Sequence, residues 1–206
     1  MNIGPPRGRV TSIATQADRV LGWLAKHRRP VVSLLRPGLT DQAIHALATQ
    51  LDWPLPSDAV DLFRWRNGTR KPSECILDEV YFFPGYYLMS LEDAVEQMPG
   101  YVNEAVWQPK WLPLFTNDAG DFMLLDCERC TPQGCPVIWF LRGEPQVWDA
   151  YDSLSAMMET LSAGFESGAI FEDEAGFLEM DQQRYATIAK RLNPRSRLWA
   201  NLAQSQ

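Results

Sequence analysis

Apolar residues at helical spacing predict three helices in the first third of the chain. Between Ile13 and Leu24 they recur every three or four residues, which predicts an amphipathic helix that ends before Pro30. Thr40 is a suitable N-cap for a second helix. The apolar stripe of that helix consists of Ala43, Ile44, Leu47, Ala48 and Leu51. A third, short helix is predicted to begin at Pro56, with Asn67-Gly68 as its C-terminal cap or turn.

The middle of the chain combines aromatic strands with one more helix. The stretch "CILDEVYFFPGYYLM" is rich in β-branched and aromatic residues and is interrupted by Pro84-Gly85. It therefore predicts a strand, a turn and a second strand. Ser90 is expected to cap the following helix, with Asp93 reaching back to the cap, and Pro99-Gly100 is expected to end it.

Four short apolar runs separated by turn residues follow, namely "WLPLF", "FMLLDC", "PVIWFL" and "QVWDAY". This pattern is typical of an antiparallel meander. Asp152 is expected to cap the next helix, which reaches Phe165, and "SGAIFEDEAG" is expected to be a loop. A last helix is predicted from about Met180 to Leu192, where Asn193-Pro194 closes it before the tail "RSRLWANLAQSQ".

Length and composition favour one packed domain. The chain has 206 residues, of which 46% are hydrophobic, so it has the material for a single core. It shows neither a signal-peptide pattern at its start nor an apolar stretch long enough to cross a bilayer, which predicts a soluble cytoplasmic protein without a membrane partner. The four cysteines are too few for a disulfide scaffold, so reduced thiols are expected.

Charge is unevenly distributed around a net value of −7. Up to Arg36, seven cations (Arg7, Arg9, Arg19, Lys26, Arg28, Arg29 and Arg36) face Asp18 alone, so the rest of the chain is strongly acidic. An acidic body repels phosphate backbones and attracts basic proteins, although it can also be ordinary solvated surface. The basic "KHRRPVVSLLR" lacks interleaved aromatic residues, and we therefore expect no nucleic-acid partner.

The segment "WLPLFTNDAGDFMLLDC" places four polar residues, Thr116, Asn117, Asp118 and Asp121, between two apolar runs. Asn117, Asp118 and Gly120 tolerate positive φ, so turn chemistry accounts for this composition. The segment lacks the ligand pattern of a calcium loop. Asp118, Asp121 and Asp126 could act as acid and base only if a pocket separated their pKa values. The favoured interpretation is a tight turn that a partner can reach.

The segment "CERCTPQGC" allows a second chemistry. Cys127, Cys130 and Cys135 could hold zinc with the distant Cys75, but the segment also fits an ordinary hairpin tip, and an oxidised pair is not expected in a reducing compartment. His27 and His45 are expected at the surface, and the chain lacks known catalytic motifs. We therefore predict no metal, no cofactor and no enzymatic activity.

The aromatic "YFFPGYY" fits either a core strand or an interface cluster. Core packing is favoured for Phe82 and Phe83, whereas the pattern leaves Tyr86 and Tyr87 open.

Four short motifs occur in a recognisable order. The first is Leu55-Pro56 before a short helix that ends in Asn67-Gly68. The second is an aromatic strand with a Ser-Leu-Glu helix start, formed by Phe82, Phe83, Gly85, Leu88, Ser90, Leu91 and Glu92. The third consists of Trp111, Pro113, Gly120, Asp121 and Asp126, and the fourth is a closing strand and helix at 147–161. Together, over about residues 38–170, they resemble the SUKH superfamily, whose founding fungal members are the Smi and Knr cell-wall regulators.

This resemblance implies an α+β fold with an antiparallel sheet of about five to six strands flanked by helices, without cofactor or catalytic residues. It divides the single domain into a basic helical extension (1–37), a SUKH-like core (38–170) and a C-terminal helical extension (171–206). Many bacterial members resemble immunity proteins that neutralise a toxin, often a nuclease, and such toxins are usually basic. We therefore predict a basic toxin as partner, contacted by Tyr86, Tyr87, Glu92, Asp118 and Asp121.

Two alternatives remain at this point. One is a scaffold of the cell-wall-signalling type, which the same resemblance implies for the fungal members. The other is a metal-dependent hydrolase that uses the acidic turn or the cysteine tip.

Overall fold

The N-terminal segment consists of two helices followed by a short strand. The structure is a computed structural model, and it describes residues 12–204. Helix α1 (Ile13–Lys26) has the predicted apolar face and packs it against α7 (Leu154–Glu166) and α4 (Ser57–Trp65). Helix α2 (Val31–Leu34) and strand β1 (Leu35–Pro37) follow. Arg7 and Arg9 of the predicted basic extension lie outside the described residues.

The next helices begin where the sequence predicts, but they end differently. The Thr40 hydroxyl oxygen accepts a hydrogen bond from Ala43 N at the start of α3 (Asp41–Ala48), which stops before Leu51. Asn67-Gly68 does not cap α4, because both residues lie in β2 (Arg66–Thr69), which pairs with β1. Long-range contacts explain this difference. Asn67 Oδ1 accepts from Leu91 N, and a Cβ on Gly68 would lie 2.5 Å from Ser90 N.

The predicted strand, turn and strand are only partly formed. Residues Leu77–Val80 form helix α5 instead of a strand, because Glu79 and Asp78 bind backbone N–H groups of Ile76 and of the distant Leu178. The second predicted strand shrinks to β3 (Tyr87–Leu88). Ser90 caps α6 (Leu91–Gln97) as predicted, with Asp93 bound to its hydroxyl group at 2.6 Å. Beyond Gln97 the chain continues as a 3-10 helix, η1 (Met98–Tyr101), through Pro99-Gly100.

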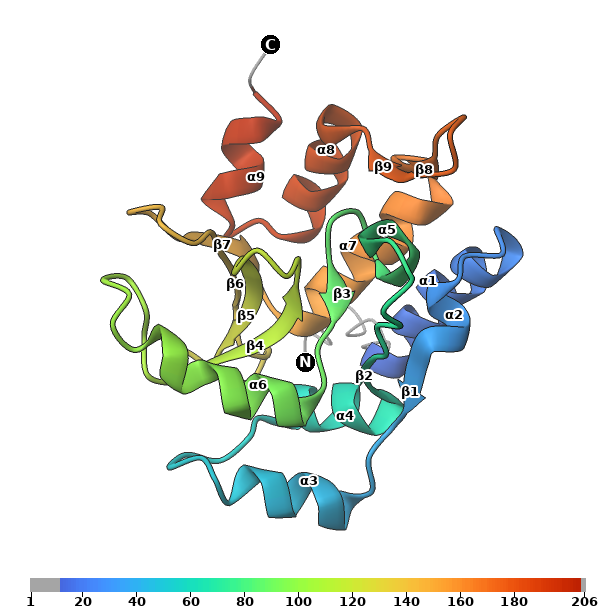
Figure 1. Cartoon of the computed structure of the whole chain (residues 1–206). Coiled ribbons are helices and arrows are strands. Elements are labelled where there is room, and N and C mark those ends of the chain that lie inside the picture. The colour runs from blue at the N-terminus through green and yellow to red at the C-terminus, as the bar shows by residue number, and fades with distance from the viewer. Residues whose placement is uncertain (1–11, 205–206) are drawn as a thin grey trace, which may run out of the picture.

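The predicted antiparallel meander is confirmed as the centre of the fold (Figure 1). Strands β4 (Trp111–Thr116), β5 (Phe122–Asp126), β6 (Val137–Phe140) and β7 (Trp148–Tyr151) follow β3 in spatial order. Both faces of the sheet are covered. Tyr101 packs on Phe122 from the side of α6 and η1, and Phe82 packs on Phe115 from the other side. The α+β class and the five-stranded sheet flanked by helices agree with the prediction.

The C-terminal part contains more structure than the sequence predicts. Ser153, rather than Asp152, caps α7, while the Asp152 carboxylate binds Arg195. The predicted loop is the hairpin β8 (Ile170–Glu172) and β9 (Leu178–Met180). Helix α8 (Gln182–Leu192) occurs as predicted. The predicted tail forms α9 (Arg197–Leu202), because Trp199 Nε1 donates to Ala150 O on β7.

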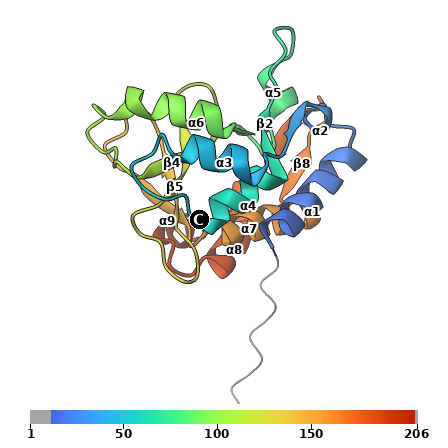
Figure 2. The same ribbon diagram turned by 90° about the horizontal axis from the view of Figure 1, so that it is seen from below.

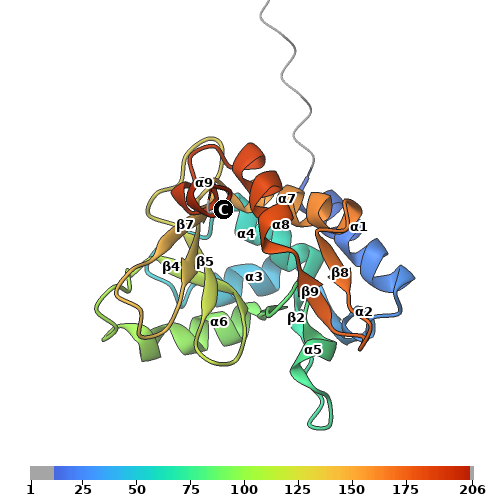
Figure 3. The same ribbon diagram turned by 90° about the horizontal axis from the view of Figure 1, so that it is seen from above.

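Helices surround the sheet on several sides. Figure 2 shows α3 next to α6, and Figure 3 shows α8 beside α9 at the β7 edge. Because Arg29 Nη1 donates to Gly176 O at 2.6 Å, the predicted N-terminal and C-terminal extensions contact each other. No helix within residues 12–204 is long and apolar enough to span a membrane.

Candidate protein-binding surface

The acidic turn at 117–121 joins β4 to β5 and has the turn chemistry predicted from its sequence. Asn117 Oδ1 accepts from Ala119 N at 2.9 Å and from Asp121 N at 3.2 Å. Asp118 and Gly120 take positive φ values of 66° and 95°. Non-glycine residues with short polar side chains tolerate this region best, which explains the choice of aspartate at 118.

Asp118 is part of a three-residue cluster that the sequence does not reveal. Lys71 Nζ lies 2.7 and 2.6 Å from the two Asp118 carboxylate oxygens and 2.8 Å from the Tyr87 hydroxyl oxygen. The Tyr87 hydroxyl group also donates to Asp118 Oδ1. Burial and the hydrogen bond to Asp118 raise the pKa of Tyr87 far above its ordinary value. The charge of Asp118 is therefore balanced within the chain.

The pKa of Asp118 reports the same balance. Partial burial acts to raise this pKa, but the hydrogen bonds from Lys71 and Tyr87 and the charge of Lys71 outweigh it, and the pKa is lowered below its ordinary value of 3.8. A lowered pKa means that the ionised form stabilises the fold.

The variant Asp118→Asn should therefore lose stability in a pH-dependent way. Asparagine tolerates the positive φ, so the change removes mainly the charge. We expect a loss of about 0.5–1 kcal/mol at neutral pH, since the pair is about 40% exposed and screened by solvent. The loss should shrink as pH falls below 3.8, where the aspartate of the wild type becomes protonated. Urea unfolding across this pH range measures it, with the exposed Glu96→Gln as control. A loss independent of pH would contradict this role of the charge.

The other predicted contact residues occupy different environments. Tyr86 and Tyr87 are buried, with exposed fractions of 8% and 5%, so both rings pack mainly within the fold, and a contact of either with a partner stays a prediction. Burial raises the pKa of Tyr86 to about 12, and its hydroxyl oxygen accepts from Trp139 Nε1 at 2.7 Å. Asp121 Oδ1 accepts from Arg142 N, in the segment that follows β6. Glu92 is exposed on α6, and its carboxylate accepts from Asn67 Nδ2 at 2.7 Å.

Helix α6 presents an exposed acidic surface whose carboxylates form no ion pair within the described residues. Its three carboxylates, Glu92, Asp93 and Glu96, are all exposed, and the helix contains no lysine or arginine. Whether this surface contacts a partner stays a prediction.

The three aspartates considered for catalysis do not converge. Asp126 is at the opposite end of β5 from Asp121, which separates them by about 16 Å at the usual rise of a strand. The Asp126 carboxylate accepts from Arg129 Nε at 2.7 Å and from the N–H groups of Glu128 and Arg129. Arg129 also binds Asp149 at 2.6 Å, and its pKa is raised by Asp149 first and by Asp126. Asp126 thus organises the turn after β5.

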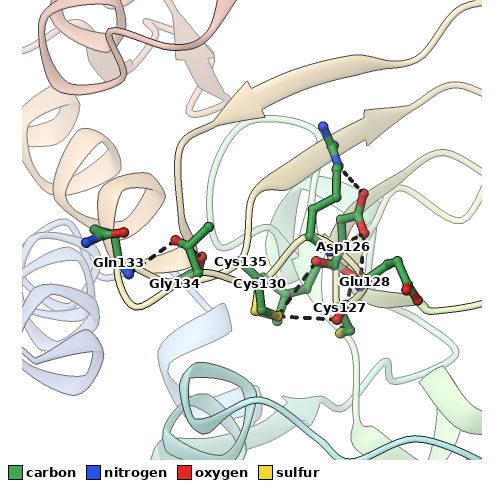
Figure 4. Close-up of a disulfide and its surroundings, with 10 residues drawn as sticks. Asp126, Cys127, Glu128, Cys130, Gln133, Gly134 and Cys135 are labelled. Carbon is green, nitrogen blue, oxygen red and sulfur yellow. Dashed lines mark hydrogen bonds and ion pairs between the residues drawn. A yellow bond between two sulfur atoms is a disulfide. The ribbon is translucent and has the colours of Figure 1, made fainter.

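The cysteine tip is oxidised, contrary to the expectation of reduced thiols. Cys130 and Cys135 form a disulfide (Figure 4). The reason is local, because Thr131 and Gly134 exchange backbone hydrogen bonds at 3.0 Å and bring the flanking cysteines opposite each other. Cys75 and Cys127 are free, and burial raises the pKa of Cys127 to about 12, so its thiol is protonated at neutral pH. The three-thiolate zinc site considered above is not formed. No group of three metal-binding side chains occurs within residues 12–204.

Removing this disulfide should cost about 2 kcal/mol of unfolding free energy, the loop-closure value for so short a loop. We expect Cys130→Ser to show this loss in chemical unfolding without reductant. Dithiothreitol should impose the same loss on the wild type and no further loss on the variant. Cys75→Ser is the matched control and should remain within about 0.5 kcal/mol of the wild type. Equal stability of the wild type with and without reductant would refute the prediction.

Comparison with known families matches residues 38–160 to the SMI1 / KNR4 family (SUKH-1). The chain belongs to the SUKH-1 family. The match covers more than half of the chain, and it includes the sheet, α3 to α6 and the start of α7. None of the curated proteins compared with the chain matches it.

Membership of the SUKH-1 family agrees with a protein-binding module of the immunity type at the level of the family. Two residues of the predicted family motifs make structural hydrogen bonds. Asn67 Oδ1 accepts from Leu91 N at the start of α6, and Asp126 Oδ1 accepts from Glu128 N in the turn after β5. Sequence reasoning missed Lys71, Arg29 and Arg129, whose partners are mostly distant along the chain. Only Asp126 and Arg129, three residues apart, are close enough to suggest an ion pair from the sequence.

Proposed function

We propose that this protein is an immunity protein that binds and neutralises a basic toxin of the nuclease type. The match to the SUKH-1 family over residues 38–160 carries this proposal. The acidic surface supports it, because exposed carboxylates such as those of α6 accelerate association with a basic protein and repel competing polyanions.

The proposal is tested by growth rescue. Cells that express a toxic protein encoded beside this chain should survive when this protein is also produced, and the two proteins should copurify in equal amounts. Survival without binding, or binding without rescue, contradicts neutralisation. A non-toxic partner in equal amount would instead support the scaffold function of the cell-wall-signalling type.

The acidic contribution is tested with Glu96→Lys, since this exposed side chain of α6 has no partner within the described residues. Charge reversal should slow association with the toxin by about tenfold at low salt and have little effect at high salt. Glu159→Lys on α7 is the matched control, because this glutamate is also exposed but lies on another helix. Stopped-flow measurements give both rates, and equal slowing by the two variants would remove α6 from the interface.

A further inference from the structure

Exposed apolar side chains gather on α5 and the β8–β9 hairpin. Six large apolar side chains are exposed within residues 12–204. Four of them belong to these two segments, namely Ile76 (55% exposed), Leu77 (43%), Phe171 (38%) and Phe177 (44%). The other two, Val102 and Leu202, belong to separate parts of the fold. Single exposed apolar residues are common, whereas a cluster marks a contact surface.

A buried arginine joins the two segments. Arg29 Nη2 donates to Asp78 O of α5 at 2.9 Å, and Nη1 donates to Gly176 O of the hairpin turn at 2.6 Å. Asp78 Oδ1 also accepts from Leu178 N at 2.9 Å. Leu77 and Phe177 are each next in sequence to a residue of this junction. The exposed side chains therefore flank one junction, and α5 lies close to β9 in Figures 1 and 3.

The hairpin turns one face outward. Glu172 pairs with Leu178, and Ile170 pairs with Met180. The apolar side chains of Ile170 and Leu178 are buried, so these pairs define the inward face of the hairpin. Because side chains alternate along a strand, Phe171 lies on the opposite, solvent-facing side with its partner Glu179. Phe177, beside the buried Leu178, falls on the same outer side.

The surface around these apolar residues is negatively charged. Segments 72–79 and 170–181 contain no lysine or arginine, and their carboxylates are Glu74, Asp78, Glu79, Glu172, Asp173, Glu174, Glu179 and Asp181. The cations nearest to them in sequence or contact are Arg29, which is buried on Asp78, the exposed Arg28 and Arg70, Lys71, which is paired with Asp118, and Arg184, which binds the carbonyl oxygens of Ser167 and Gly168. A second copy of this chain would bring like charges together, which disfavours a symmetric dimer through this surface.

We propose that this surface, named here the hairpin surface (Ile76, Leu77, Phe171 and Phe177 with their acidic surroundings), docks a basic protein segment that carries apolar side chains. The apolar residues supply the buried centre of the contact and the carboxylates supply its polar rim. We assign this segment to the toxin, and this assignment rests on the proposed function. Since the hairpin lies beyond residues 38–160, the contact adds a part of the chain outside the family match to the interface.

The probes are three fluorescent peptides of equal length, with alternating lysine and leucine, lysine and serine, or glutamate and leucine. Fluorescence anisotropy should show that the wild type binds the lysine-leucine peptide about tenfold more tightly than the lysine-serine peptide, and the glutamate-leucine peptide least. The double variant Leu77→Ser/Phe177→Ser should lose this preference. The control, Val102→Ser/Leu202→Ser, removes two exposed apolar side chains elsewhere and should keep this preference.

The outcomes separate this inference from the proposed function. Equal peptide binding by the two double variants overturns the hairpin surface, as does a wild-type dimer in sedimentation that Leu77→Ser/Phe177→Ser dissociates. Loss of both peptide binding and toxin rescue in Leu77→Ser/Phe177→Ser supports the surface as the toxin contact.

Loss of peptide binding with rescue intact supports the hairpin surface as a site for basic segments and overturns its assignment to the toxin. Failure of the wild type to rescue, with peptide binding still dependent on Leu77 and Phe177, refutes only the proposed function. Circular dichroism of each variant confirms folding.

Discussion

Replacing Arg29 with methionine is expected to lower the free energy of unfolding by about 3–5 kcal/mol. The arginine is 6% exposed, and the side chain of its partner Asp78 is 13% exposed. Methionine fills the space of the aliphatic stem but leaves Asp78 Oδ2 and two carbonyl oxygens, those of Asp78 and Gly176, without their donor. Unpaired buried charges and acceptors are among the most costly defects in a fold.

A double-mutant cycle distinguishes this pairing from packing. Asp78→Asn removes the charge on the other side, so the loss in Arg29→Met/Asp78→Asn should be smaller than the sum of the two single losses by more than 1 kcal/mol, a coupling expected of contacting residues. Lys26→Met replaces an exposed cation of the same N-terminal segment and should change stability by less than about 0.5 kcal/mol. Additive losses would show that Arg29 and Asp78 do not act as a pair.

Arg29 also shows why the sequence predicts only part of this fold. It appears in the sequence as one of several cations in a basic run, yet its contacts lie 49 and 147 positions away. The same contacts hold Asp78 in α5, where aromatic and β-branched neighbours predict a strand. Local propensity is a weak preference, and tertiary contacts override it here.

Elements encoded by neighbouring residues are predicted well. Thr40 and Ser90 cap their helices as expected, because the acceptor and donor are three residues apart. The meander is predicted because apolar runs and turn residues alternate within a short distance. The β8–β9 hairpin is missed because Glu172, Asp173, Glu174 and Glu179 occupy its short strands and turn, so its sequence resembles a solvated loop.

In the candidate site, too, local contacts are predicted from the sequence and long-range contacts are not. The turn chemistry of Asn117 and Gly120 is local and is predicted, whereas the partner of Asp118 is Lys71, 47 positions away. Tyr86 and Tyr87 are largely buried, which aromatic composition alone does not reveal because it does not distinguish a core strand from an interface, and their role as contact residues stays a prediction. The disulfide depends on the hairpin pairing of Thr131 with Gly134, which the number of cysteines does not reveal.

Replacing Asp126 with alanine should lower the free energy of unfolding by about 2–3 kcal/mol. The carboxylate is 6% exposed and accepts from two backbone N–H groups, which alanine leaves without an acceptor, whereas the half-exposed Arg129 can turn to water. Asp126→Asn keeps one oxygen for these groups and should lose about half as much, and Asp149→Asn, at an exposed position, less than about 1 kcal/mol. Thermal unfolding ranks the three variants.

This ranking decides between a structural and a catalytic Asp126. If the protein acts by binding, Asp126→Ala should reduce toxin rescue only through the smaller amount of folded protein, so that lower temperature restores rescue together with the circular dichroism signal. Asp126→Asn, which retains most of the stability, should then protect cells almost as well as the wild type. An Asp126→Asn protein that is folded and binds the toxin with unchanged affinity, yet gives no protection, would assign chemistry to this carboxylate and refute neutralisation by binding alone.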